Sequence, residues 1–214
     1  MSGGGDQEGH ARPELELGTG LPAELRDYPV GADVGHQASY SRFMPLVKWL
    51  LAFPHYLVLF VLGLAAALAL VVAFFSVLLT RHYPRPCFDL ILGTYRSGWR
   101  VGAYVYLLVD PYPPFTLGDD PSYPARLEIA YPEGGVDRWR APFAWLLAIP
   151  YLLVTGVLIN LTGLLTFFAF FTILFTERYP KGMFELALVP LRWQLRGTAY
   201  AHFMVTRYPP IVWG

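Results

Sequence analysis

Two long apolar runs dominate the chain, one from about Phe43 to Thr80 and the other from about Trp139 to Thr176. Each is much longer than the ~18 consecutive apolar residues that indicate a membrane span. A straight helix over such a run would extend about 57 Å, whereas the hydrocarbon core of a bilayer is roughly 30 Å thick. The pattern leaves two structures open: a helix of which only the part after Pro54 crosses, or a tight helical hairpin with two short arms.

The two runs belong to a tandem repeat, because a shift of 96 residues superimposes one on the other without a gap. The matches include Trp, Pro, Tyr and Arg, which composition alone does not easily align. Two motifs recur in both copies: Tyr83-Pro84 with Tyr179-Pro180, and Tyr112-Pro113-Pro114 with Tyr208-Pro209-Pro210. A pair of arginines recurs as well: Arg96 and Arg100 with Arg192 and Arg196.

Together these motifs carry a resemblance to a known family. Each copy has an apolar run with an internal proline, then Tyr-Pro, then Arg-x-x-x-Arg-x-x-x-Tyr, then Tyr-Pro-Pro, over about Tyr28 to the C-terminus. This pattern resembles the DUF4389 family of bacterial membrane proteins, here in two tandem copies. The family is one of unknown function, so the resemblance implies a membrane location and adds no substrate, cofactor or catalytic residue.

The repeat sets the expected organisation of the chain. We expect a disordered polar tail at 1–27, a first membrane repeat at 28–115, a linker at 116–122 and a second membrane repeat at 123–214. Tyr123–Tyr131 alternates between apolar and polar residues, as a half-exposed strand does, and Tyr28–Val34 occupies the equivalent place in the first copy. Two short strands that pair at the surface are therefore expected.

Charge placement favours the hairpin. Seven acids lie in Met1–Ser39 and six in Asp110–Asp137, whereas bases flank both ends of both apolar runs. If bases mark the cytoplasmic side, each run must cross an even number of times. Asn160-Leu161-Thr162-Gly163 would supply the turn in the second run. Single crossings, completed by a second span in the segment that follows each run, also give an even number. The matching charge pattern favours parallel rather than inverted copies.

The segments after the runs, 88–109 and 184–205, have the profile of amphipathic helices. They place arginines on one face and apolar side chains on the other, which is typical of helices that lie in a membrane surface. The predicted lipid-headgroup contacts are Arg96, Arg100, Arg192 and Arg196. The alternative places these arginines inside a bundle, paired with Asp89 and Glu185.

Composition agrees with a membrane class. Apolar residues make up 55% of the chain and charged residues 15%, with a net charge of zero, which excludes a strongly basic nucleic-acid-binding protein. One cysteine allows no intramolecular disulfide. The predicted fold is all-α, a tandem repeat of an apolar transmembrane hairpin or helix plus an amphipathic interfacial helix, with short surface strands.

No motif in the sequence supplies catalytic chemistry, so no catalytic, cofactor-binding or metal site is predicted. The leading hypothesis is a non-enzymatic, multi-pass protein of the bacterial plasma membrane that organises lipid, anionic lipid included, or serves as an accessory subunit of a membrane complex. The second is a small transporter or channel with a pathway between the repeats, tested at Asn160 or His55. The third is a membrane enzyme that acts on lipids with surface residues such as Asp89, Glu185 and the Tyr-Pro motifs.

Overall fold

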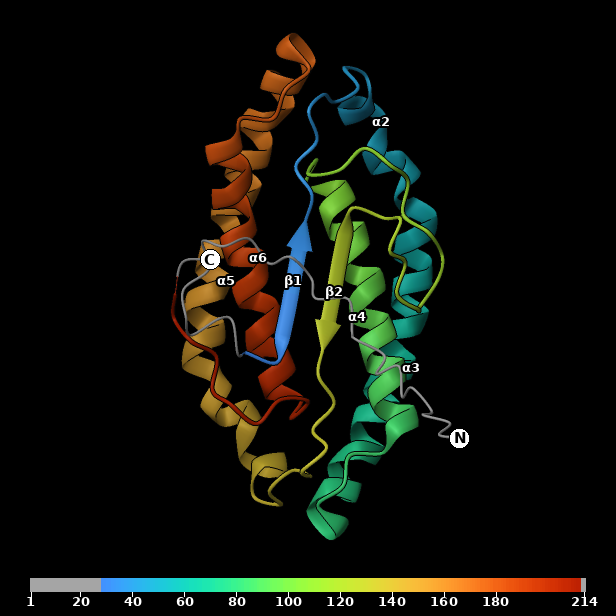
Figure 1. Ribbon diagram of the computed structural model, residues 1–214, viewed down its shortest axis with the longest axis vertical. Helices are drawn as coiled ribbons and strands as arrows, with labels where there is room; N and C mark the ends of the chain where they lie inside the picture. Colours follow the sequence, from blue (N-terminus) through green and yellow to red (C-terminus); the bar gives the residue numbers. More distant parts are fainter. Residues whose placement is uncertain (1–27, 213–214) are drawn as a thin grey trace, which may run out of the picture.

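The structure is a computed structural model that describes residues 28–212, so the predicted disordered tail at 1–27 lies outside the described residues. Its elements are β1 (Val30–Val34), α2 (Met44–Leu51), α3 (Phe53–Thr80), α4 (Arg85–Val105), β2 (Ala125–Ile129), α5 (Arg140–Thr176) and α6 (Lys181–Ala201). They form three layers (Figure 1). The strands pack on α4 and α6, and these helices pack in turn on α3 and α5.

The apolar runs form extended helices, so the predicted hairpin is wrong. Helix α5 continues for 37 residues through the expected turn, and α2 with α3 covers the equivalent stretch of the first repeat with a break at Ala52. The amide of Asn160 donates to the carbonyls of Gly156 and Val157 in its own helix, at 3.1 and 3.2 Å. Because its polar group is satisfied one turn back, the side chain does not compete with the helical backbone.

Each long helix ends at the same place in its repeat. Arg81 and Glu177 adopt left-handed backbone conformations, with φ of 62° and 58°, immediately after the last helical residue. The next helices, α4 and α6, take Pro84 and Pro180 as their N-caps, where the missing N–H of proline costs no hydrogen bond. The Tyr-Pro motif therefore separates the two helices of each repeat, as the sequence predicts.

The two predicted strands are present and pair with each other. Strands β1 and β2 run antiparallel, with Ala32 opposite Leu127 at the centre of the ladder. These two residues occupy the same position in their repeats, since Tyr28 aligns with Tyr123. Equivalent residues can face each other in this way only across a twofold axis, so a pseudo-twofold axis passes between Ala32 and Leu127.

The backbone hydrogen bonds between the two copies occur in pairs that this axis relates. Gly35 donates to the carbonyl of Pro124, and Ala130 donates to that of Pro29, both at 2.8 Å. Further along the chain, the N–H of Tyr40 reaches the carbonyl of Glu177, and the N–H of Val136 reaches that of Arg81. The strand of each repeat thus pairs with the strand of the other repeat, and the segment that follows it binds the helical hairpin of the other repeat.

The outer helices bury small side chains and expose large ones. Helix α3 buries Ala69, Ala73 and Val77 against its neighbours, and α5 buries Ala144, Ala148 and Ala169. Large apolar side chains point away from the protein, among them Phe60, Leu68, Val157 and Phe168. Small residues inside permit close helix packing, and the faces left uncovered are almost entirely apolar.

Candidate functional site

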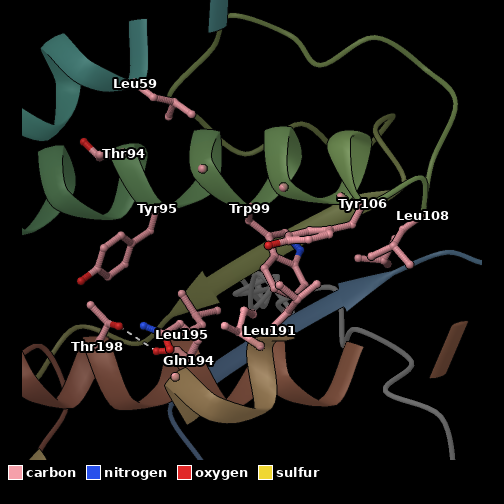
Figure 2. A pocket seen from close by; sticks show the side chains of 16 residues that line it. Leu59, Thr94, Tyr95, Trp99, Tyr106, Leu108, Leu191, Gln194, Leu195 and Thr198 are labelled. Carbon is pink, nitrogen blue, oxygen red and sulfur yellow. Dashed lines mark hydrogen bonds between the residues drawn. The ribbon is translucent and has the colours of Figure 1, made fainter. Parts of the chain in front are cut away.

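A cavity of about 630 Å³ lies between the two repeats. Figure 2 shows that α4 and α6 form its opposing walls. Val34 of β1 and Trp99 line the side nearest the sheet, whereas Leu59 of α3 and Ile159 of α5 line the side of the outer helices. The indole N–H of Trp99 donates to the carbonyl of Asp33 at 3.2 Å, which fixes this ring against the strand. The cavity falls within the usual size range of ligand pockets.

Two aligned positions on the cavity walls differ in polarity between the copies of the repeat. Gly98 and Gly102 on α4 are equivalent to Gln194 and Thr198 on α6, and all four line the cavity. A Cβ built on either glycine would meet no atom within 4 Å, so the space beside them is open. At these aligned positions the α6 wall therefore carries an amide and a hydroxyl that the α4 wall lacks.

A tyrosine and a histidine from different repeats meet beside the cavity. The hydroxyl of Tyr95, which lines it, lies 2.5 Å from Nδ1 of His202. Burial raises the pKa of the tyrosine and lowers that of the histidine. Both shifts favour the uncharged forms, so this pair adds hydrogen-bonding capacity to the site and no charge.

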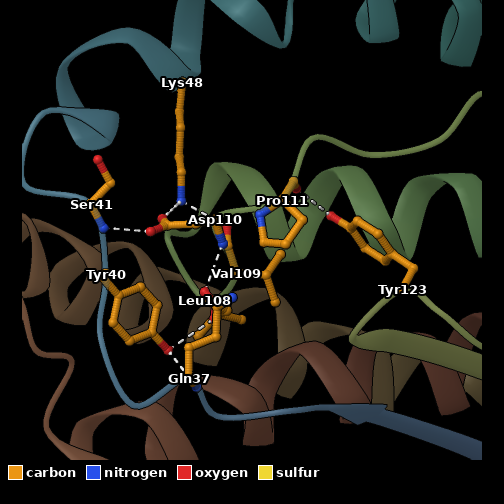
Figure 3. A network of polar contacts seen from close by, with 9 residues as sticks. All are labelled: Gln37, Tyr40, Ser41, Lys48, Leu108, Val109, Asp110, Pro111 and Tyr123. Carbon is orange, nitrogen blue, oxygen red and sulfur yellow. Dashed lines mark hydrogen bonds and ion pairs between the residues drawn. The ribbon is translucent and has the colours of Figure 1, made fainter.

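A second polar cluster surrounds Lys48, which is 1% exposed. Its ammonium donates to the carbonyl of Val109 and to Oδ1 of Asp110, both at 2.7 Å. Asp110 also accepts from the N–H of Ser41, and its own N–H donates to Gln37 (Figure 3). Because every one of these groups is partnered by another part of the chain, the cluster ties α2 to the segment after α4.

The four arginines that the sequence predicts as lipid-headgroup contacts all lie against other parts of the protein, Arg96 and Arg192 half-buried and the other two buried. Arg100 and Arg196 are 2% and 5% exposed. Arg100 donates to the carbonyls of Thr116 and Gly118, at 2.9 and 2.6 Å. The long segment after α4 wraps back over its helix and presents backbone carbonyls to this guanidinium, an arrangement that helical periodicity does not reveal.

Arg96 and Arg192 fasten the sheet to the helices. Arg96 Nε donates to the carbonyl of Leu127 at 3.1 Å, and Arg192 Nε donates to that of Ala32 at 3.0 Å. These carbonyls belong to the central pair of the ladder, so the two contacts are related by the pseudo-twofold axis. Arg192 also forms an ion pair with Asp33, whereas the alternative drawn from the sequence paired the arginines with Asp89 and Glu185.

The tyrosines of the repeat motifs are divided between core and surface. Tyr83 and Tyr179 are buried in the core. Tyr112 and Tyr208 are about half exposed and pack edge-on against Tyr104 and Tyr200. The Tyr-Pro-Pro segments, Tyr112-Pro113-Pro114 and Tyr208-Pro209-Pro210, thus fold back onto the helices of their own repeats.

His55 is also a packed residue. Its ring is 3% exposed and stacks on Phe115, with ring centroids 4.1 Å apart. Tyr151 takes its place in the second repeat and packs against Trp193. Over residues 28–212, no group of three or more His, Cys, Asp or Glu side chains is arranged to hold a metal ion.

The fold defines a duplicated protein. Each repeat contributes a helical hairpin and a strand that packs on the hairpin of the other repeat. The two repeats together line a mostly apolar cavity. The family model described as a domain of unknown function, DUF4389, matches residues 45–116 and 138–212. These two matches cover more than half of the chain, so the protein belongs to the DUF4389 family and contains two tandem copies of its domain. No curated protein and no solved structure matches the chain.

Replacing Arg100 with methionine tests its internal role. The variant keeps the apolar stem but leaves the carbonyls of Thr116 and Gly118 without their charged donor, so we expect the free energy of unfolding to fall by about 2–3 kcal/mol. The control is Arg42→Met, which removes an exposed ion pair with Glu177 and should cost less than about 1 kcal/mol. Chemical unfolding in detergent measures both. Equal losses would contradict the assignment.

Proposed function

We propose that the protein is a non-catalytic integral membrane protein that organises lipid, or that serves as an accessory subunit of a membrane complex. The observation that carries this proposal is the uncovered apolar face formed by α3 and α5. Both Met44–Thr80 and Arg140–Thr176 are long and apolar enough to cross a membrane, and the most apolar window of each has at most 17% of its residues buried within the protein. A soluble core helix would be mostly buried, so a nonpolar solvent is the natural surrounding for these faces.

The position of the charges supports the same proposal. Between Lys48 and Arg81, and again between Arg140 and Glu177, the chain has no Asp, Glu, Lys or Arg. Exposed bases stand at the ends of these stretches, where they can meet anionic headgroups with about 1 kcal/mol of attraction each. The cytoplasmic membrane of a bacterium is the proposed location.

The internal use of polar groups supports a structural rather than a catalytic role. Lys48, Arg96, Arg100 and Arg192 are each committed to carbonyls or carboxylates of the same chain. Groups held in this way stabilise one arrangement of the two repeats and are not directed at a substrate.

Membrane fractionation tests the proposal. The wild-type chain should stay with the membrane through an alkaline wash, because its outer helices lie in hydrocarbon. A double variant, Leu68→Glu with Phe168→Glu, introduces one acid at the centre of each exposed face, at a cost of about 2–3 kcal/mol each, and should be extracted. Ala130→Glu, on the exposed end of the sheet segment, is the matched control and should stay bound. Recovery of the wild-type protein in the soluble fraction would contradict the proposal.

The cavity between the two repeats favours a second candidate, a transporter for an apolar or amphipathic solute. Its position between the repeats matches the pathway expected for a duplicated transporter, and its lining is mostly apolar. Gly102→Leu should fill the cavity without disturbing the backbone, since the space beside Gly102 is open. Solute flux in proteoliposomes that this variant abolishes would support transport. A wild-type protein without flux would leave the lipid-organising role as the better description.

A further inference from the structure

The arrangement of the two repeats determines how the molecule meets a bilayer. Helices α3 and α5 run in opposite directions along the longest dimension of the protein, and the sheet lies beside their middle (Figure 1). We propose that both helices lie in the plane of the membrane, embedded in one leaflet, and do not cross it. This inference rests on the proposed membrane role and names the surface and the lipid layer that it occupies.

The length of the helices is the first argument. Helix α5 has 37 residues and therefore extends about 55 Å, against a hydrocarbon core of roughly 30 Å. To keep its whole uncharged length inside that core, the helix would have to tilt by about 57° from the membrane normal, whereas crossing helices tilt by about 0–40°. A helix that lies along the membrane plane is not limited by the thickness of the bilayer.

The position of the sheet is the second and stronger argument. The pseudo-twofold axis passes between Ala32 and Leu127, so this pair lies at the midpoint of the molecule. If the helices crossed the bilayer, the axis would lie in the membrane plane. The neighbouring side chains of Asp33, Arg126 and Glu128 would then stand near the centre of the hydrocarbon.

Such a position is costly for the charged side chains. Asp33 and Glu128 are exposed, and the charged side chains on this strand pair reach the surface of the protein. Exposed carboxylates are strongly disfavoured at the centre of a bilayer, where neither water nor headgroups can solvate them. This face of the molecule therefore belongs in water.

Charge symmetry is the third argument. The hydrogen bond from Val136 to Arg81 joins the start of α5 to the end of α3, and the bond from Tyr40 to Glu177 joins the start of α2 to the end of α5. Among residues 28–212, each end therefore carries three exposed bases: Arg81, Arg85 and Arg138 at one end, and Arg42, Arg178 and Lys181 at the other. Crossing helices usually show an excess of bases on one side, whereas these exposed bases are equally divided between the two ends.

An in-plane position satisfies all three constraints. The pseudo-twofold axis then points along the membrane normal, so both repeats have the same orientation relative to the lipid. The uncovered faces of α3 and α5 enter the acyl region, the bases at the helix ends meet the headgroups, and the charged sheet faces water. Bases at both ends of both runs require an even number of crossings, and zero crossings meets that requirement.

Site-directed labelling decides between the two orientations. Three single-cysteine variants in a Cys87→Ser background probe the ends of α5 and the sheet: Arg138→Cys, Arg178→Cys and Glu128→Cys. A membrane-impermeant maleimide is added to spheroplasts and, separately, to inverted membrane vesicles. We expect all three cysteines to be labelled in one of the two preparations and to lose labelling in the other.

A fourth variant, Leu164→Cys, monitors the embedded face. Leu164 is 54% exposed in the middle of α5, so its cysteine should be protected in both preparations and become reactive in detergent. If Arg138→Cys and Arg178→Cys are labelled from opposite sides and Glu128→Cys is unreactive, the helices cross and the in-plane inference is overturned, while the membrane role stands.

The same variant detects failure of the membrane role itself. If Leu164→Cys reacts equally with and without detergent, the face is not embedded, and both the inference and the proposed function fall. The protein could instead be recovered as a soluble oligomer in which Leu164→Cys is protected. A second copy would then cover the apolar face of α3 and α5 in place of lipid, and the in-plane inference would be overturned.

Discussion

The antiparallel pairing of β1 with β2 is the interaction on which the rest of the structure depends. It places equivalent residues, Ala32 and Leu127, opposite each other and so creates the pseudo-twofold axis. The outer helices touch each other much less than each touches its own hairpin partner, so the strands hold the repeats together. Arg96 and Arg192 extend this connection, since each binds the carbonyl of one member of the central pair. The cavity, the reversed directions of α3 and α5, and the central place of the sheet all follow from that axis.

The sequence reveals the parts of this fold that are local. The duplication is visible because Pro, Tyr, Trp and Arg recur at one fixed spacing, and the strands are visible because Tyr123–Tyr131 alternates. The end of each apolar helix is visible because Tyr83-Pro84 and Tyr179-Pro180 interrupt it. The strands and the helix ends depend on backbone chemistry within a few residues, and the structure confirms them.

The features that the sequence does not reveal are set by contacts between distant segments. The helical periodicity predicts Arg100 as a surface residue, but the segment that follows the helix folds back and buries it. The sequence around Asn160 predicts a turn, but the amide of Asn160 donates to carbonyls of the same helix. The cavity is formed by Gly98 and Gly102 of one repeat against Gln194 and Thr198 of the other. Because the two helices come from different repeats, nothing local in the sequence indicates that these positions face each other.

The central claim is that the charged sheet at the midpoint of the molecule keeps α3 and α5 in the plane of the membrane. Oriented circular dichroism of the protein in aligned anionic bilayers measures this directly, because the helical band near 208 nm is polarised along the helix axis. The account predicts a strong negative band there, which indicates helices parallel to the membrane surface. Loss of that band, which indicates helices along the membrane normal, would contradict it.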